Sequence, residues 1–130
     1  MKLLVDTHVW LWMNAHPDRL GERARALVDD RGNELLLSAA SSWEIAIKHA
    51  LGRLPLPAPP DVYVPDRMRR TGTTPLPVEH SHALNVASLP LHHRDPFDRL
   101  LVAQARAIGV PILTVDPVFG EYDVEVVPAR

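Results

Sequence analysis

Two aspartates, Asp95 and Asp98, open the helical pattern HRDPFDRLLVAQA. Asp95 has an ordinary structural role there, because an aspartate placed before a helix, with proline next, caps the free amides of the first turn. On a helical wheel at about 100° per residue, Asp98 falls on the apolar side, between Val102 and Ala105. A carboxylate that faces a core is costly unless a cation or a hydrogen-bond donor meets it, so Asp98 is a candidate for chemistry.

Three further acids lie where strands are expected to end. Asp6 follows the apolar run LLV, Asp116 follows ILTV, and Glu44 lies in the first turn of a helix entered from LLLS. Open parallel sheets bind ligands beyond the carboxyl ends of their strands. If the strand order brings these segments together, the three acids and Asp98 meet at one edge of the sheet.

Each acid also has a plain structural interpretation. Asp6 can cap the helix that follows it, Asp116 can belong to a turn, and Glu44 can pair with Lys48 one helical turn later. Four independent caps and pairs would not be expected to gather at the same end of one sheet. A shared site is therefore the more economical interpretation.

Such a cluster needs a proton or a cation. Two carboxylates about 5 Å apart repel each other by roughly 3 kcal/mol at an effective dielectric constant near 20. Ligand sets made of oxygen favour Mg²⁺ or Mn²⁺ over zinc or copper. An ion of this kind keeps positions open for water and phosphate oxygens, which suits phosphodiester hydrolysis.

The segments that must position these acids alternate short apolar runs with helical patterns, which predicts an α/β fold. Most of the apolar runs lack polar alternation, as buried parallel strands do. LPLPAPP is expected to form an extended loop, and the chain is long enough for one domain, residues 1–130, with a mainly parallel sheet flanked by helices. The predicted strands are 3–5, 35–38, 111–115 and 124–127, with a short one near 74–76, and the predicted helices are 9–14, 20–30, 42–51, 61–70, 79–88 and 96–108.

Composition narrows the class of protein. The chain is 46% hydrophobic, has a formal net charge of −2 and contains no cysteine. These values predict a soluble globular protein of a reducing, cytoplasmic environment, without thiol chemistry. The N-terminal apolar run is interrupted by Asp6 and His8, so neither a signal sequence nor a membrane span is expected. The slightly acidic total gives no support for broad electrostatic capture of nucleic acid, and any such binding requires a local basic patch.

The chain resembles the PIN-domain family, specifically the VapC-type toxin ribonucleases of type II toxin–antitoxin pairs. The motifs that carry the resemblance are LLVDTH, SAASSWEIAIK, DPFDRLLVAQA and ILTVD, in this order over essentially the whole chain. The resemblance implies an endoribonuclease that hydrolyses RNA phosphodiester bonds and leaves a 5'-phosphate and a 3'-hydroxyl. It also implies that a catalytic and metal-binding quartet holds Mg²⁺ or Mn²⁺; the quartet falls on Asp6, Glu44, Asp98 and Asp116.

The resemblance suggests supporting residues as well. Thr7 and Thr114, beside the first and last acids, match positions that orient carboxylates in similar proteins, although a buried threonine bonding its own backbone is an equal alternative. Asp95 could add an outer contact beside its capping role. Some relatives carry one more acid where this chain has Val118, so the number of metal ions stays open.

RNA is a polyanion, so it can approach the acidic site only if basic residues surround that site. Lys48 and Arg99 are the candidates by position, whereas the arginine run in DRMRRTG reads as a solvated face. The histidine pairs lack the helical spacing of metal ligands, and we assign them no role. Trp10 and Trp43 continue apolar stripes, which predicts core packing rather than stacking on bases.

Partners follow mainly from the resemblance. The helical segment VWLWMNA is apolar on more than one face, which predicts a surface left for a partner. The resemblance implies a homodimer and an antitoxin whose tail fills the active-site groove. Contact with DNA would come only through the antitoxin, and no membrane is involved.

Two other functions fit the fold class. A phospho-receiver module has similar size and acidity but needs an acidic pair after its first strand and a lysine after a late strand, whereas this chain offers only Asp6 and no such lysine. A PIN fold kept only for protein interaction, without catalysis, is the second alternative. The intact quartet argues against it.

Overall fold

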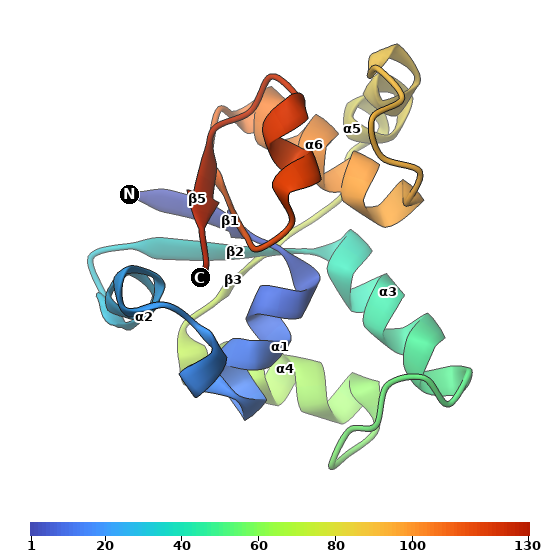
Figure 1. Ribbon diagram of the computed structural model, residues 1–130. Helices are drawn as coiled ribbons and strands as arrows, with labels where there is room; N and C mark the ends of the chain where they lie inside the picture. Colours follow the sequence, from blue (N-terminus) through green and yellow to red (C-terminus); the bar gives the residue numbers. More distant parts are fainter.

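A parallel β-sheet lies between two layers of helices in the computed structural model, which describes all residues from Met1 to Arg130 (Figure 1). The sheet has five strands in the order β3-β2-β1-β4-β5, and every neighbouring pair is parallel. This arrangement confirms the predicted α/β class. In chain order the elements are β1 Lys2–Val5, α1 Thr7–Ala15, η1 Pro17–Arg19, α2 Glu22–Asp29, β2 Glu34–Ser38, α3 Ala39–Ala50, α4 Pro60–Thr71, β3 Thr74–Leu76, α5 His80–Asn85, η2 Val86–Ser88, α6 Pro96–Ile108, β4 Ile112–Thr114, η3 Pro117–Glu121 and β5 Val126–Pro128.

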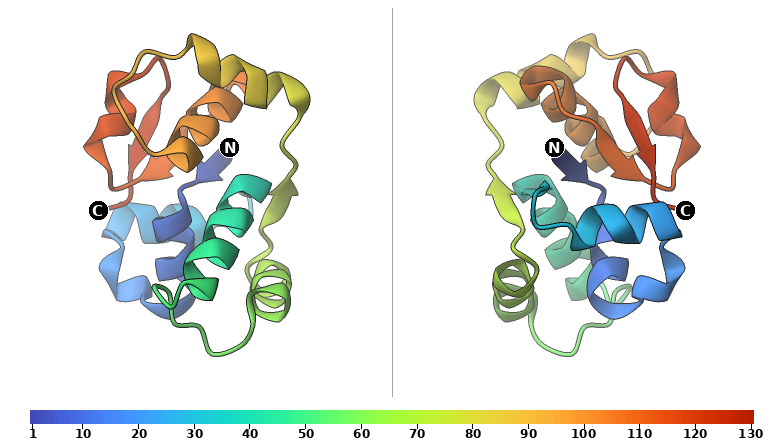
Figure 2. Two further views of the ribbon diagram at one scale, coloured as in Figure 1. Left: turned by 90° about the vertical axis from the view of Figure 1, so that its right-hand side faces the viewer. Right: turned by 90° about the vertical axis from the view of Figure 1, so that its left-hand side faces the viewer.

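The two helical layers enclose two separate cores. Leu3 and Val5 point to a cluster under α1, α2, α3 and α4, whereas Leu4 points to a second cluster under α6. This alternation is what a strand buried on both faces requires. Both turned views show α5 and α6, in yellow and orange, on one side of the sheet and α1 to α4, in blue to green, on the other (Figure 2).

The strand and helix predictions are largely confirmed, with differences at the ends of elements. α6 has the predicted bounds, because Asp95 caps its start and Gly109, with a φ of 68°, ends it in the left-handed conformation that glycine adopts readily. The predicted helix 79–88 divides into α5 and the short η2. Two further 3₁₀ turns, η1 and η3, each begin at a proline and were not expected.

Helix α1 is better covered than its composition predicted. Leu11, Trp12 and Met13 are half-buried and pack against the core. The guanidinium groups of Arg19 and Arg130 lie 5.7 and 5.2 Å from the Trp12 ring centroid, where they cover part of it. α1 therefore leaves less apolar surface for a partner than expected.

The prediction of a buried Trp43 was wrong. Trp10 is fully buried as expected, but Trp43 is 62% exposed and meets Phe97 edge to face, with ring centroids 5.3 Å apart. The reason is that α3 turns its other face, with Ser41 and Ile45, toward the sheet. Trp43 is therefore a large exposed apolar side chain on the same helix as the candidate acid Glu44. No helix of the molecule has the length and apolar character needed to cross a membrane.

Candidate active site

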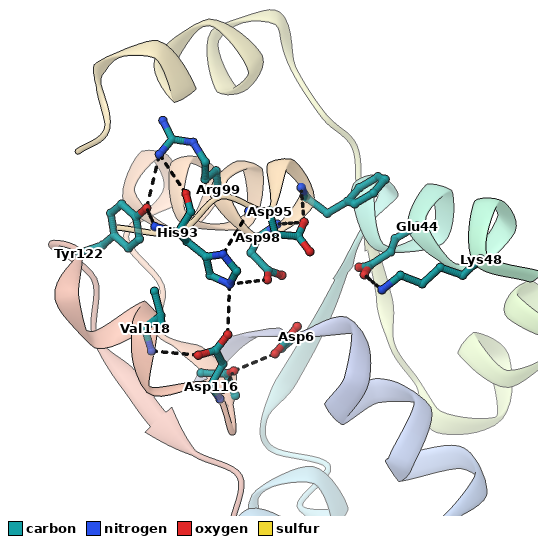
Figure 3. A network of polar contacts seen from close by, with 12 residues as sticks. Asp6, Glu44, Lys48, His93, Asp95, Asp98, Arg99, Asp116, Val118 and Tyr122 are labelled. Atoms are coloured by element: carbon teal, nitrogen blue, oxygen red, sulfur yellow. Dashed lines mark hydrogen bonds and ion pairs between the residues drawn. The ribbon is translucent and has the colours of Figure 1, made fainter. Parts of the chain in front are cut away.

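The candidate acids meet at the carboxyl ends of the central strands, where the strand order reverses. β1 lies at the centre of the sheet, next to β2 on one side and β4 on the other. Asp6 follows β1 directly, and Asp116 follows β4 after one intervening residue. This juncture is the topological switch point at which open α/β sheets bind ligands. Figure 3 shows Asp6, Glu44, Asp98 and Asp116 directed into one region between the ends of these strands and the helices α3 and α6.

Asp6 serves the site rather than its own helix. Although it occupies the position before α1, its side chain makes no capping hydrogen bond. Instead its Oδ2 accepts a 2.7 Å hydrogen bond from the Thr114 hydroxyl, and the residue is only 4% exposed. Burial raises the pKa of Asp6, and the hydrogen bond from Thr114 only partly opposes this. The capping interpretation of Asp6 was therefore wrong.

Glu44 lies on the buried face of helix α3. The Ser38 hydroxyl caps the start of this helix by accepting a hydrogen bond from the amide of Ala40. Its Oε2 forms the expected ion pair with Lys48, but the pair is not a surface feature, since the Glu44 side chain is 3% exposed. Its Oε1 is buried and has no hydrogen-bond partner. An unpartnered carboxylate oxygen is costly unless a bound group completes it.

Lys48 is tied to the same carboxylate. Burial lowers the pKa of Lys48, but the hydrogen bond and negative charge of Glu44, with Asp95 and Asp98 farther away, outweigh it, so the pKa is raised. The ammonium group therefore stays charged and neutralises part of the site. Its contact with RNA remains a prediction, and 37% of its side chain is exposed at the rim.

Asp95 and Asp98 divide their tasks as the helical wheel predicted. Asp95 Oδ1 accepts hydrogen bonds from the amides of Phe97, at 2.8 Å, and of Asp98, at 3.3 Å, which confirms the cap. The Asp98 side chain turns inward and is 15% exposed. Burial raises its pKa to about 8, and the nearby carboxylates add to the effect; they are those of Asp6, Asp95, Glu44 and Asp116. Asp98 therefore feels the negative charge of each of the other candidate acids.

Asp116 is both a turn residue and a member of the acidic cluster. Its Oδ1 accepts a 3.0 Å hydrogen bond from the amide of Val118, as a turn residue does, and its own amide donates to the Thr114 hydroxyl. Its Oδ2 faces the site, 3.1 Å from Nε2 of His93.

His93 was missed by the sequence analysis, which assigned the histidines no role, yet its ring contacts two of the acids. Its Nε2 lies 2.9 Å from Asp98 Oδ2 as well as 3.1 Å from Asp116 Oδ2. The ligand atoms of the three residues lie within 4.8 Å of one another. Helical spacing gave no sign of it, because His93 belongs to an irregular segment before α6. The signal available in the sequence was its position two residues before the capping Asp95.

The remaining candidates have other partners. The Thr7 hydroxyl donates to Ser41 Oγ at 2.8 Å and touches no carboxylate. The Arg99 guanidinium donates to backbone carbonyls of the segment before α6, including those of Pro90 and Val86, at 3.0 and 3.1 Å. Arg99 therefore has a structural task, and its contact with RNA is not supported by these bonds.

The residues present fit a divalent cation. The acids supply oxygen ligands, which hard cations prefer. Glu44 Oε1 lacks any partner, and the pKa of Asp98 indicates carboxylates that cannot all be ionised without a compensating charge. A cation held among them would satisfy both conditions.

The amino-acid sequence matches a known family and two named relatives. The family model described as "PIN domain" matches residues 3–125. Ribonuclease VapC16 of Mycobacterium tuberculosis is 64% identical over 58 residues, which are 45% of this chain and 41% of that protein. Ribonuclease VapC22 of the same organism is 31% identical over 118 residues, 88% of this chain and 86% of that protein. The chain thus spans less than half of the first relative and most of the second.

A solved structure shares the fold. The VapBC2 complex from Rickettsia felis, bound to a DNA fragment from its promoter, contains a chain that superimposes with a TM-score of 0.73 at 13% sequence identity, with 100% of both chains covered. At this identity the likeness concerns the path of the backbone, including the parallel sheet that carries the acids.

Proposed function

Because this chain belongs to the PIN-domain family, as its motifs predicted, we propose that it is a metal-dependent endoribonuclease that hydrolyses RNA phosphodiester bonds. Two of its relatives are named ribonucleases. The observation that carries the proposal is that the four acids lie close enough for the charges of Asp6, Glu44 and Asp116 to act on Asp98, while a buried oxygen of Glu44 has no hydrogen-bond partner. The catalytic and metal-binding residues in this proposal are Asp6, Glu44, Asp98 and Asp116.

Mg²⁺ or Mn²⁺ is the cofactor that suits this ligand set. When bound, the ion would polarise the scissile phosphate and favour ionisation of an attacking water. The proposed ligands are already held by hydrogen bonds and an ion pair. The Thr114 hydroxyl donates to Asp6, and the Val118 amide donates to Asp116. Lys48 pairs with one oxygen of Glu44. This preorganisation means that little rearrangement is needed when the ion enters.

The substrate approaches a negatively charged pocket, so its phosphates need positive charge at the rim. Lys48 is the candidate nearest the acids, with an exposed part of its side chain beside Glu44. Trp43, exposed and in contact with Phe97, offers an aromatic face on which a base can stack. Both side chains lie on α3, which makes this helix the proposed RNA-facing side of the site.

The biological role proposed is that of the toxin in a toxin–antitoxin pair acting in the cytoplasm. Chains with the same fold occur in the VapBC2 complex and in a toxin–antitoxin complex from Klebsiella pneumoniae. A protein antitoxin and a second copy of this chain are the proposed partners, and DNA would be met only through the antitoxin. The exposed Leu51, directly after α3, supports a covered surface in such an assembly.

Cleavage of a labelled RNA pool by the purified chain tests the enzymatic proposal. We expect cleavage with Mg²⁺ or Mn²⁺, none with EDTA, and none by Asp98→Asn with either ion. Asp95→Asn is the matched control, because asparagine can still cap α6, and it should remain active. Cleavage that persists in EDTA, or in Asp98→Asn, would contradict the proposal.

Expression in bacteria separates the toxin from an inactive PIN fold kept for interaction. The intact chain should arrest growth, and the Asp98→Asn variant at equal abundance should not. Co-expression with a cognate antitoxin should restore growth. Equal growth with both variants would favour the interaction protein instead.

A further inference from the structure

We infer that His93 is a positioning residue whose Nε2–H holds the carboxylates of Asp98 and Asp116 side by side, and that it is not itself a ligand of the metal ion. The inference rests on the proposed function, since it concerns how two of the proposed ligands are prepared for the ion. It gives a task to a residue that sequence patterns did not single out.

The His93 ring lies between two acids whose carboxylates would repel each other when both are ionised. Its Nε2 is 2.9 Å from Asp98 Oδ2 and 3.1 Å from Asp116 Oδ2, and Figure 3 shows both contacts converging on this one nitrogen. A donor shared in this way draws the two oxygens together. It also leaves the second oxygen of Asp98 available to another partner.

The tautomer of His93 is fixed by the backbone. The amide of Asp95 donates a 3.1 Å hydrogen bond to Nδ1 of the ring. Because an amide N–H can only donate, Nδ1 carries no proton, and the neutral ring must carry its proton on Nε2. The nitrogen that faces the acids is therefore a donor.

This tautomer argues against ligation. His93, Asp98 and Asp116 lie close enough to share an ion. Binding an ion through Nε2, however, would require the ring proton to move to Nδ1, where it would face the N–H of Asp95. Two donors pointed at each other are unfavourable, and the capped turn that holds Asp95 resists the rearrangement.

The position of His93 is determined by the surrounding structure. Its amide donates to Tyr122 Oη at 2.8 Å, and its carbonyl accepts from Arg99 Nη1 at 3.5 Å. Its ring meets that of Phe119 edge to face, with centroids 6.1 Å apart. Arg99 thereby anchors the segment that presents His93, which accounts for a guanidinium directed at backbone carbonyls rather than at solvent.

The tautomer and the ligand role can be measured on the wild-type protein, without any substitution. Nitrogen-15 NMR of the histidine rings in the metal-free protein should show His93 with a protonated Nε2 and an unprotonated Nδ1. Pulsed EPR of the protein loaded with Mn²⁺ should show no directly bound imidazole nitrogen. A protonated Nδ1, or a nitrogen coupling typical of a bound imidazole, would overturn the inference.

Two variants test the positioning role through the Mn²⁺ affinity measured by calorimetry without RNA. Glutamine can place an amide N–H near the Nε2 position, whereas asparagine reaches only the Nδ1 position. We expect His93→Gln to bind Mn²⁺ within about threefold of wild type and His93→Asn to bind about tenfold more weakly, as losses of outer-shell partners do. His92→Asn, at the exposed neighbouring residue, should bind as wild type does, and circular dichroism verifies that each variant is folded.

The outcomes separate this inference from the proposed function. Equal Mn²⁺ affinity for wild type and His93→Asn, or an equal loss in His93→Gln and His93→Asn, would overturn the role of His93 alone. Absence of Mn²⁺ binding to the wild-type protein would overturn the proposed metal site and this inference with it.

Discussion

Thr114 Oγ1 donates a 2.7 Å hydrogen bond to Asp6 Oδ2 across 108 residues of sequence, and the same oxygen accepts a 3.0 Å hydrogen bond from the amide of Asp116. One hydroxyl thus links the acids that follow the two central strands. The pairing of β1 with β4 brings these two acids together, and the Thr114 hydroxyl then holds them in place.

Replacing Thr114 with valine should weaken Mn²⁺ binding by about tenfold, because the shape is kept while the link between the two acids is lost. Calorimetry measures the affinity. Thr7→Val is the matched control. The Thr7 hydroxyl donates to Ser41, and only the backbone amide of Thr7, which valine keeps, contacts Asp6, so the affinity should stay near that of wild type. An equal loss in both variants would mean that Thr114 acts through general packing.

The metal-free protein should lose stability as the pH rises from about 4 to about 8. Asp98 ionises near 3.8 in the unfolded chain, but burial raises its pKa to about 8 in the fold, so over this range the native state holds a proton that the unfolded chain has lost. We expect the free energy of unfolding to fall by an amount on the order of 2 kcal/mol, reduced by water that reaches part of the site.

Urea unfolding at a series of pH values measures this effect, with EDTA present throughout. Asp98→Asn, which cannot ionise, should show a smaller decline over the same range. Two parallel curves would show that Asp98 does not titrate in this way. Added Mn²⁺ should offset the decline in the wild-type protein only, since the ion binds the ionised carboxylate.

Removing Lys48 should destabilise the metal-free protein. Lys48→Ala leaves the buried Glu44 carboxylate without its cation, and we expect a loss of about 1 to 2 kcal/mol, less than for a fully buried pair because Lys48 is partly exposed. Lys2→Ala is the control, since Lys2 pairs with Glu34 at the surface, with side chains 62% and 42% exposed. Thermal unfolding in EDTA compares them, and equal shifts would contradict the importance of burial.

The cap on α6 can be separated from the chemistry of the site. Asp95→Ala removes the oxygen that accepts from Phe97 and Asp98, and should lower the free energy of unfolding by about 1 kcal/mol. Asp95→Asn keeps an acceptor oxygen and should lose much less. Urea unfolding measures both variants, and a larger loss in Asp95→Asn would assign Asp95 an electrostatic role instead.

The sequence predicted a residue's environment correctly where that environment depends on the helix or strand that contains the residue. The wheel position of Asp98 predicted its inward direction, and the cap at Asp95 predicted the start of α6. Strand order was not available from local patterns, yet it is what brings Asp6 and Asp116 together.

The predictions failed for residues whose surroundings depend on how separate elements pack together. The apolar stripe of α3 predicted a buried Trp43, but the helix packs through the face that carries Ser41, Glu44 and Ile45. A polar buried face is unusual and is explained by the site that Glu44 joins. His93 was missed because its contacts come from an irregular segment whose path depends on Arg99 and Tyr122.

Mn²⁺ binding by Glu44→Gln tests the central claim most directly, because Glu44 carries the buried oxygen that has no partner. Calorimetry should find that the wild-type protein binds Mn²⁺ and that Glu44→Gln binds it about tenfold more weakly or worse. Glu22→Gln, on the exposed first turn of α2, should bind Mn²⁺ as the wild type does. Equal affinities in the wild type and Glu44→Gln would contradict a cation site built on these converging acids.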